Sequence, residues 1–305
     1  LATYAPMHLA RGICSGNARF GAYSLIIGLD GALKVLSCAA LWIGGVTNVG
    51  AYALTIALSP VIGIGIASVT GNLRTDPGPA ASWSEVTPNL GWLLIGSLFA
   101  AALVNAGPIT VDILGHDAPP ELVTRFGNAV IFARIPLFLF QAVQAALLPR
   151  LARLAAQRKL SEFKRGLNQL LVVVGAVGVI GTAGAFVLGP WVLELVYDGG
   201  IDRRTMTLLA FASALYMLAL AIAQAVIALS GHGRVAIGWC AGFITFALVA
   251  WLSSNDLYLR VELALVASSV ISLAIFFLTL NAKMSGNVSF DDGSMIDVFA
   301  ERPLD

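Results

Sequence analysis

The chain has 305 residues, of which 58% are hydrophobic and only 11% are charged, and its mean hydropathy is +0.86. This composition excludes a soluble globular protein and indicates a chain that lies largely inside a membrane. The net charge of +1 by itself argues neither for nor against a nucleic-acid partner, and we expect none.

About eight long stretches with almost no charge follow one another along the chain. Each reaches or exceeds the roughly 20 apolar residues that a helix needs to cross a ~30 Å hydrocarbon layer. They cover residues 20–44, 47–69, 90–114, 126–148, 168–196, 205–230, 235–254 and 258–280. The chain is therefore predicted to be an all-α polytopic membrane protein with about eight transmembrane helices.

Cysteine and histidine give no sign of a disulfide framework or a metal site. The three cysteines, Cys14, Cys38 and Cys240, form no CxxC pair, and an odd number without characteristic spacing predicts no set of disulfides. The three histidines fall in predicted loops without ligand-like spacing. We expect no metal and no cofactor.

Basic residues gather after the fourth stretch, where the sequence PRLARLAAQRKLSEFKRG contains a single acid, Glu162. By the positive-inside rule this loop is cytoplasmic, and alternation of the spans then places both ends of the chain on the cytoplasmic side of the cell membrane. The basic loop either sets the topology alone or also attracts anionic lipid head groups, so membrane lipids are expected partners. The polar, acidic segment 281–305 is predicted to be a disordered cytoplasmic tail.

A five-residue pattern, S-G-x-x-R, occurs at two related places. It covers residues 15–19 before the first stretch and residues 230–234 before the seventh. Glycine and serine suit a tight turn between antiparallel helices, and arginine suits the head-group level. Either two short turns have converged, or two repeated bundles each carry the turn before their fifth helix, as transporters built from repeats would.

Three stretches resemble oligosaccharide flippases of the multidrug/oligosaccharidyl-lipid/polysaccharide exporter superfamily. They read RGICSGNARFGAYS, NAGPITVDIL and FARIPLFLFQAVQAALLPRLARLAAQRKLSEFKRGL. In that family a basic R-G-x-x-x-G-x-x-R-F-x-x-Y turn leads into the fifth helix. An L-P-R-L-type motif closes the eighth helix and is followed by a basic loop. The resemblance covers roughly residues 9–280.

The resemblance implies a MATE-like fold with twelve or fourteen helices in two lobes. Residues 1–70 would then hold the last two helices of an incomplete N-terminal lobe, 71–89 a cytoplasmic linker and 90–280 a six-helix C-terminal lobe. The first four helices of such a protein are missing, so we expect the chain to be truncated at its N-terminus.

The resemblance also implies a function. Such proteins move a polyprenyl-pyrophosphate-linked oligosaccharide from the cytoplasmic to the outer leaflet by alternating access, for the synthesis of cell-surface polysaccharide. The expected partners are this lipid-linked substrate and the polysaccharide polymerase or glycosyltransferases that handle it.

Two charged residues lie one helical turn apart inside the first stretch. A charge at mid-membrane costs roughly 2.5–3.5 kcal/mol on insertion scales, and the spacing of Asp30 and Lys34 lets the two neutralise each other. The pair is either a tolerated, self-compensated pair or a site at which Lys34 meets a substrate phosphate while Asp30 holds it or exchanges a proton.

Polar residues in the fourth stretch are predicted to share one helical face. Arg134, Gln141 and Gln144 fall within about an 80° arc of a continuous helix. An arginine fork suits pyrophosphate, and the amides suit sugar hydroxyls. Alternatively, the glutamines bond to neighbouring helices and Arg134 extends to the outer interface. Asn105, near Gly107-Pro108 in the third stretch, is a further cavity candidate, because proline bends the helix there.

Three other functions compete with the flippase. A cation-coupled drug or metabolite exporter of the same fold would use Asp30 for ion coupling. An integral-membrane glycosyltransferase would need carboxylates such as Asp198 and Asp202, but these lie in a short polar loop beside arginines, and we expect no enzymatic activity. A membrane partner that does not itself transport is the third.

Overall fold

The computed structural model describes residues 3–285 except 18, 76–82, 117–118 and 198–200, and within the helices it leaves the side chains of 83–86, 88 and 141–149 undescribed. The described residues form ten α-helices and no strand. They divide into two compact units, Leu1–Ala80 and Ala81–Asp305. The division falls inside the range 71–89 that the sequence assigns to a linker between lobes.

Unit 1 consists of three helices, α1 (Tyr4–Gly16), α2 (Phe20–Ile43) and α3 (Val49–Val69). The sequence analysis predicted two helices here and left out α1, which at 13 residues is too short to cross a membrane. Its apolar face, with Met7, Ala10 and Cys14, is buried against the other two helices. Packing in this small core, rather than membrane insertion, therefore accounts for α1.

A glycine lets α2 and α3 approach closely. A Cβ atom on Gly63 of α3 would lie 3.3 Å from the backbone oxygen of Ile26 in α2, so a larger residue would push the helices apart. Close approach through small residues is the usual way in which helices associate where lipid removes the hydrophobic driving force.

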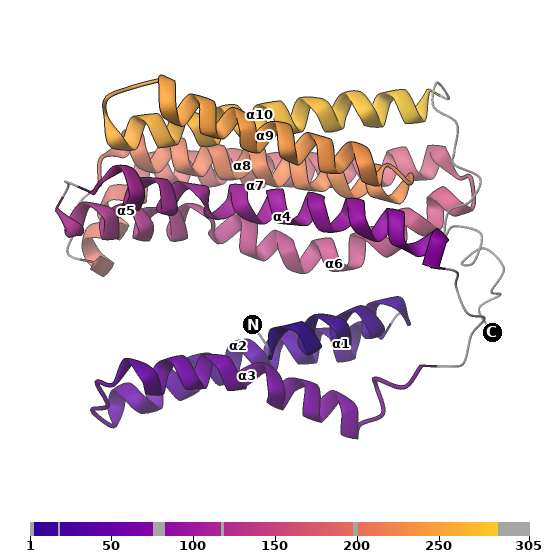
Figure 1. Ribbon diagram of the computed structural model, residues 1–305, viewed down its shortest axis with the longest axis horizontal. Coiled ribbons are helices and arrows are strands. Elements are labelled where there is room, and N and C mark those ends of the chain that lie inside the picture. The colour runs from indigo at the N-terminus through magenta and orange to yellow at the C-terminus, as the bar shows by residue number, and fades with distance from the viewer. Residues whose placement is uncertain (1–2, 18, 76–82, 117–118, 198–200, 286–305) are drawn as a thin grey trace. The chain divides into compact units, whose positions relative to one another are not determined.

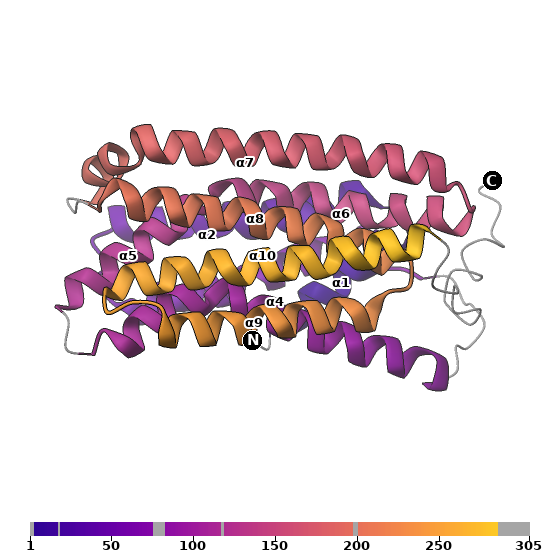
Figure 2. The same ribbon diagram turned by 90° about the horizontal axis from the view of Figure 1, so that it is seen from above.

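Unit 2 is a bundle of seven helices, in which the longer helices run side by side and the short α5 lies at one end (Figures 1 and 2). They are α4 (Trp83–Leu114), α5 (Pro120–Ala133), α6 (Ile135–Ala156), α7 (Leu160–Tyr197), α8 (Arg203–Ala228), α9 (His232–Leu252) and α10 (Leu257–Met284). Helix α8 is the most buried of the spans and packs against α7, α6, α5 and α10. Helix α9 packs between α4 and α10.

Seven of the described helices are long and apolar enough to cross a membrane: α2, α3, α4, α7, α8, α9 and α10. They match seven of the eight predicted stretches, and the chain is an all-α, multi-pass membrane protein. Most apolar side chains of unit 2 that are exposed belong to these spans, for example Val179 and Ile180 of α7 at 71% exposure each, as expected where hydrocarbon is the solvent.

The remaining predicted stretch, the fourth (126–148), is not one continuous helix, and this corrects the prediction. Helix α5 ends at Ala133, Arg134 adopts φ −100° and ψ 0°, and α6 begins at Ile135. Pro136 explains the break, because it has no N–H to donate to the carbonyl of Phe132 and its ring would clash with that carbonyl. At the start of α6, by contrast, proline is well tolerated.

Two predicted boundaries also move. Helix α4 begins at Trp83, so the segment between the two units is shorter than the predicted 71–89. Helix α10 continues to Met284, four residues past the predicted end of the last span. The rest of the predicted tail, 286–305, lies outside the described residues.

Candidate functional site

Asp30 is the buried polar centre of unit 1. Its Oδ2 atom lies 2.6 Å from the Lys34 ammonium, and its Oδ1 accepts a hydrogen bond of 2.7 Å from the hydroxyl of Ser59 in α3. The ammonium of Lys34 also lies 4.9 Å from the centre of the Tyr4 ring in α1, a cation–π distance. The predicted pair therefore forms, and two further helices contribute to it.

Ser59 was not foreseen from the sequence, although a signal exists. It precedes Pro60, which cannot donate to the carbonyl of Ile56, and the Ser59 hydroxyl lies 3.2 Å from that oxygen as well as near Asp30. The single hydroxyl proton of Ser59 can go to the Asp30 carboxylate at 2.7 Å or to the Ile56 carbonyl at 3.2 Å. Both carboxylate oxygens of Asp30 are occupied, while the Lys34 side chain stays 25% exposed and has donors left over.

Arg134 occupies the break between α5 and α6 in unit 2. Fourteen residues of α5 separate it from Pro119, a length of roughly 21 Å, which is more than half of a ~30 Å hydrocarbon layer. Its half-buried side chain lines a small cavity of about 20 Å³ together with Tyr216 of α8 and Ser269 of α10. A cavity of that size holds about one water molecule.

The guanidinium of Arg134 has no hydrogen bond or ion pair with any other described side chain or backbone group. The Tyr216 hydroxyl beside it is directed to the carbonyl of Ala100, 3.2 Å away. A guanidinium carries five donors, and a charge without a counter-ion is costly inside a bilayer. The guanidinium of Arg134 therefore has donors that no described residue uses.

An apolar cavity of about 230 Å³ adjoins the Arg134 cavity, and the two share Ala133, Leu137 and Ser213. It lies among α5, α6, α7 and α8, next to the break between α5 and α6. The glycines of α7 shape its wall: Gly181 packs on Pro136, whereas a Cβ on Gly184 would meet nothing within 4 Å. The Arg134 cation and the apolar cavity thus lie next to each other.

Of the other predicted cavity residues in unit 2, Asn105 is not among the residues that line the Arg134 cavity. Asn105 is exposed on α4, and its amide donates to the carbonyl of Ala101 one turn earlier. The predicted arc of Arg134, Gln141 and Gln144 assumed a continuous helix, and the break at Arg134 removes that assumption. The side chains of Gln141 and Gln144 lie outside those that the structure describes.

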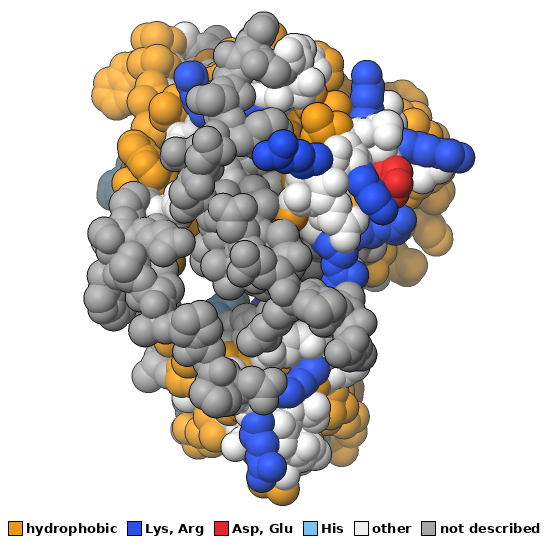
Figure 3. All heavy atoms as spheres, turned by 90° about the vertical axis from the view of Figure 1, so that its right-hand side faces the viewer, with side chains coloured by type: hydrophobic (Ala, Val, Ile, Leu, Met, Phe, Trp, Pro, Cys, Tyr) orange, Lys and Arg blue, Asp and Glu red, His pale blue; other side chains and the backbone are white. Residues whose placement is uncertain are grey.

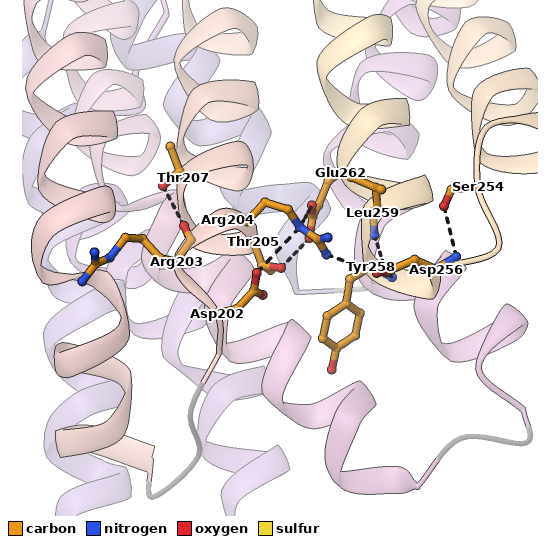
Figure 4. Close-up of polar contacts among 10 residues, drawn as sticks. All are labelled: Asp202, Arg203, Arg204, Thr205, Thr207, Ser254, Asp256, Tyr258, Leu259 and Glu262. Atoms are coloured by element: carbon orange, nitrogen blue, oxygen red, sulfur yellow. Dashed lines mark hydrogen bonds and ion pairs between the residues drawn. The ribbon is translucent and has the colours of Figure 1, made fainter.

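Glu262 of α10 is a buried carboxylate that the sequence analysis missed. It is 0% exposed, and its Oε1 accepts a hydrogen bond of 2.6 Å from the Thr205 hydroxyl in α8. Its Oε2 has no hydrogen bond and lies 3.6 Å from Nε of Arg204 (Figure 4). The sequence did contain a signal for this residue, because Glu262 is the one acid inside the predicted span 258–280. An ionisable residue within a span is a functional candidate by default.

Arg204 lies among three carboxylates at this end of unit 2. Besides Glu262, it contacts Asp256 at 3.3 Å and Asp202 at 3.7 Å (Figure 4). Asp256 also caps α10 by accepting hydrogen bonds from the backbone N–H groups of Tyr258 and Leu259. The bond from Leu259, with the neighbouring Arg204 charge, lowers the pKa of Asp256 below its usual range. The carboxylates therefore outnumber the cation here.

The predicted enzymatic candidates do not form a paired site in the described part of the chain. Asp198 lies outside it, and Asp202 is an exposed residue before α8 that pairs with Arg204. Among the described residues, no group of three or more histidine, cysteine, aspartate or glutamate side chains could hold a metal ion.

Comparison with known sequences gives remote relatives of unknown function. No family model matches the chain. It is 26% identical over 282 residues to an uncharacterized protein of Mycobacterium tuberculosis (strain H37Rv) and, equally, to one of Mycobacterium bovis. These matches cover 88% of this chain and 62% of the relatives, so the chain spans about three fifths of their length.

Comparison with solved structures shows the fold. The chain is similar to the MATE transporter VcmN of Vibrio cholerae, with a TM-score of 0.76 and 12% identity over 93% of this chain and 67% of that one. It is also similar to a multidrug resistance MATE family transporter of the MOP superfamily in an outward-facing conformation. There the TM-score is 0.69 and the identity 14%, over 92% of this chain and 66% of that one. The chain therefore has a MATE-like fold.

Proposed function

We propose that this MATE-like chain belongs to a membrane transporter that moves a polyprenyl-pyrophosphate-linked oligosaccharide across the cell membrane by alternating access. The observation that carries the proposal is the guanidinium of Arg134, which lacks a counter-ion among the described residues and adjoins an apolar cavity of about 230 Å³. An anion attached to a hydrocarbon chain matches both features.

Each part of such a substrate has a candidate partner in the chain. The fork of Arg134 can donate two parallel hydrogen bonds to a pyrophosphate, and the apolar cavity beside it can take part of the isoprenoid chain. Gln141 and Gln144, about two and about three turns beyond Arg134 along α6, remain candidates for sugar hydroxyls. Lys34 is a second candidate cation, because Asp30 uses only part of its donor capacity.

Leaflet transfer of the substrate by the natural full-length protein tests this proposal. Vesicles with a fluorescent polyprenyl-pyrophosphate sugar in both leaflets are treated with a quencher, and the fraction protected is followed over time. We expect Arg134→Gln to slow transfer at least tenfold, and Arg134→Lys to slow it less, because a charge remains but the fork is lost. Arg203→Gln, which alters an exposed arginine outside the cavity, is the matched control and should transfer normally.

Two outcomes would contradict the proposal: wild-type transfer no faster than in empty vesicles, or an Arg134→Gln variant that inserts normally and transfers at the wild-type rate. Size-exclusion profiles and thermal unfolding in detergent establish that each variant is folded. A deficit in transfer then reports on the site rather than on the amount of folded protein.

A cation-coupled exporter of drugs or metabolites is the second candidate, and Glu262 is the observation that favours it. Ion coupling calls for carboxylates that are buried in the protein yet able to change their charge. Glu262 is fully buried and has an oxygen without a hydrogen bond, and Asp30 is a second buried carboxylate. Drug efflux that stops in both Asp30→Asn and Glu262→Gln, together with absent transfer of the lipid-linked sugar, would support this function over the first.

A further inference from the structure

The first turns of α7 carry polar and apolar side chains in a fixed order. Residues of this segment line an open groove of about 660 Å³. Along the groove lie two cations, then two amides, then two valines: Lys164 and Arg165, Asn168 and Gln169, Val172 and Val173.

Helical spacing places these residues on one exposed face of α7. The opposite face, with Phe163, Leu167 and Val174, is buried in the core of unit 2. From Lys164 to Val172 the helix rises about 12 Å. That length crosses a polar interface of roughly 5–8 Å and reaches the hydrocarbon beyond it.

The cations at this end have little internal compensation. Arg150, Arg153, Arg158 and Lys159 accompany Lys164 and Arg165, and all six side chains are exposed. Within the described part of the chain, the only carboxylate that pairs with any of them is Glu162, 3.9 Å from Lys159. Figure 3 shows lysine and arginine side chains gathered on this end of the molecule, with one acidic side chain among them.

The apolar end of the groove continues into a surface that faces hydrocarbon. Val172 and Val173 are 71% and 58% exposed, and one to two turns further along α7 Val179 and Ile180 are each 71% exposed. Exposed valine and isoleucine on a spanning helix are solvated by lipid chains. A ligand held by the cations would therefore have its apolar part among lipid chains.

We propose that this face of α7 binds an anionic phospholipid of the bilayer, with its phosphate at Lys164 and Arg165, its polar backbone at Asn168 and Gln169, and its acyl chains along Val172 and Val173. Charge complementarity and continuity with the lipid-facing surface identify the occupant. Basic pockets on the cytoplasmic side of membrane proteins commonly bind such head groups. The inference does not depend on the substrate proposed above.

Native mass spectrometry of the full-length protein with defined lipids tests the inference. We expect phosphatidylglycerol to remain bound where phosphatidylcholine does not, and Lys164→Gln/Arg165→Gln to weaken phosphatidylglycerol binding about 10- to 30-fold. Lys164→Arg/Arg165→Lys, which keeps both charges, should bind within about threefold of wild type and shows that the site tolerates substitution.

The matched control is Arg158→Gln/Lys159→Gln, which removes the same charge at the same end but does not alter the groove lining. It should weaken binding less than threefold. Equal losses in the two double variants would mean a diffuse attraction to charge and would overturn the site.

Two competitors separate the possible sources of the phosphate. Inorganic phosphate should displace phosphatidylglycerol poorly, because it lacks the chains that contact Val172 and Val173; displacement at millimolar concentration would overturn the proposed chain contact. Polyprenyl pyrophosphate should also be a weak competitor here. If it displaces phosphatidylglycerol at equimolar concentration, the groove is a substrate site and the phospholipid proposal is wrong.

Discussion

Among the described residues, each unit has one buried carboxylate that is bonded to a hydroxyl of another helix and lies near a cation. In unit 1, Asp30 of α2 accepts from Ser59 of α3, and Lys34 lies 2.6 Å away. In unit 2, Glu262 of α10 accepts from Thr205 of α8, but its cation is 3.6 Å away and does not form a hydrogen bond to Oε2. The first carboxylate is fully compensated, and the second is not.

The difference in compensation suggests different roles. Both oxygens of Asp30 are occupied, one by the Lys34 ammonium and one by the Ser59 hydroxyl of α3. Glu262 keeps one bond, to Thr205, whichever charge state it has. Unit 1 therefore has the arrangement expected of a structural joint between α2 and α3. Unit 2 has the arrangement expected of a group that can respond to its surroundings.

The largest expected effect comes from breaking the pair in unit 1. Asp30→Leu leaves Lys34 without its carboxylate, and breaking a buried ion pair by removing one partner costs about 3–5 kcal/mol, here toward the lower end because Lys34 is 25% exposed. The midpoint of thermal unfolding in detergent should fall clearly. Asp30→Leu/Lys34→Leu should recover most of the loss, because an apolar pair avoids the desolvation of both charges.

The double variant is the internal control for that prediction. A double variant no more stable than Asp30→Leu would show that packing or the bond from Ser59, rather than the unpaired charge, accounts for the cost. The interpretation of Asp30 and Lys34 as a self-compensated pair would then be wrong.

A smaller effect is expected at the equivalent carboxylate of unit 2. Glu262→Gln keeps an acceptor for Thr205 and loses only the attraction to Arg204, whose side chain is 44% exposed. We expect a cost of about 1 kcal/mol or less, visible as a small shift in thermal unfolding. Glu262→Leu, which strands the buried Thr205 hydroxyl, should cost about 1–3 kcal/mol. Equal costs for the two variants would contradict the view that Oε2 contributes little.

Much of this arrangement could be predicted from the sequence, and the failures have physical reasons. The spans were predictable because hydrocarbon demands about 20 apolar residues in a row, and the contact between Asp30 and Lys34 was predictable because helix geometry fixes neighbours four apart. The break at Arg134 could have been predicted only by reading Pro136 as a residue of the first turn of a new helix, where proline is favoured, and not as a residue within a helix.

The partners of the buried carboxylates could not be predicted. Ser59 and Thr205 lie 29 and 57 residues away from the groups they bond to, and no local rule sets which faces of distant helices meet. Helix α1 was missed because its apolar face is buried by packing within unit 1 and not by the membrane. Contacts between distant helices depend on tertiary packing, and the spacing of residues along one helix does not predict them.

The smallest expected effects concern the two S-G-x-x-R turns. A cation bonds to a backbone carbonyl at both turns, but the cation comes from the turn in unit 1 and from another helix in unit 2. In unit 1, Arg19 of the turn donates to the carbonyls of Asn72 and Arg74 after α3. In unit 2, the residue just before the turn supplies an acceptor instead: Lys283 at the end of α10 donates to the carbonyl of Leu229, 2.9 Å away. In unit 1 the contact joins the turn between α1 and α2 to the segment after α3, and in unit 2 it joins the end of α8 to the end of α10.

Arg19→Gln and Lys283→Gln should each lower stability by about 1 kcal/mol, because each removes charge-assisted bonding to backbone carbonyls. Lys283→Gln should cost the more of the two, because Lys283 is buried, at 9% exposure. Arg234, the counterpart of Arg19 in the second turn, is exposed and makes no such bond among the described residues, so Arg234→Gln should stay within about 0.5 kcal/mol of wild type. Thermal unfolding of the three variants in one detergent compares them directly. A larger loss of stability for Arg234→Gln than for Arg19→Gln would mean that Arg234 stabilises the second turn. The interpretation that Lys283, rather than Arg234, takes the place of Arg19 there would then be wrong.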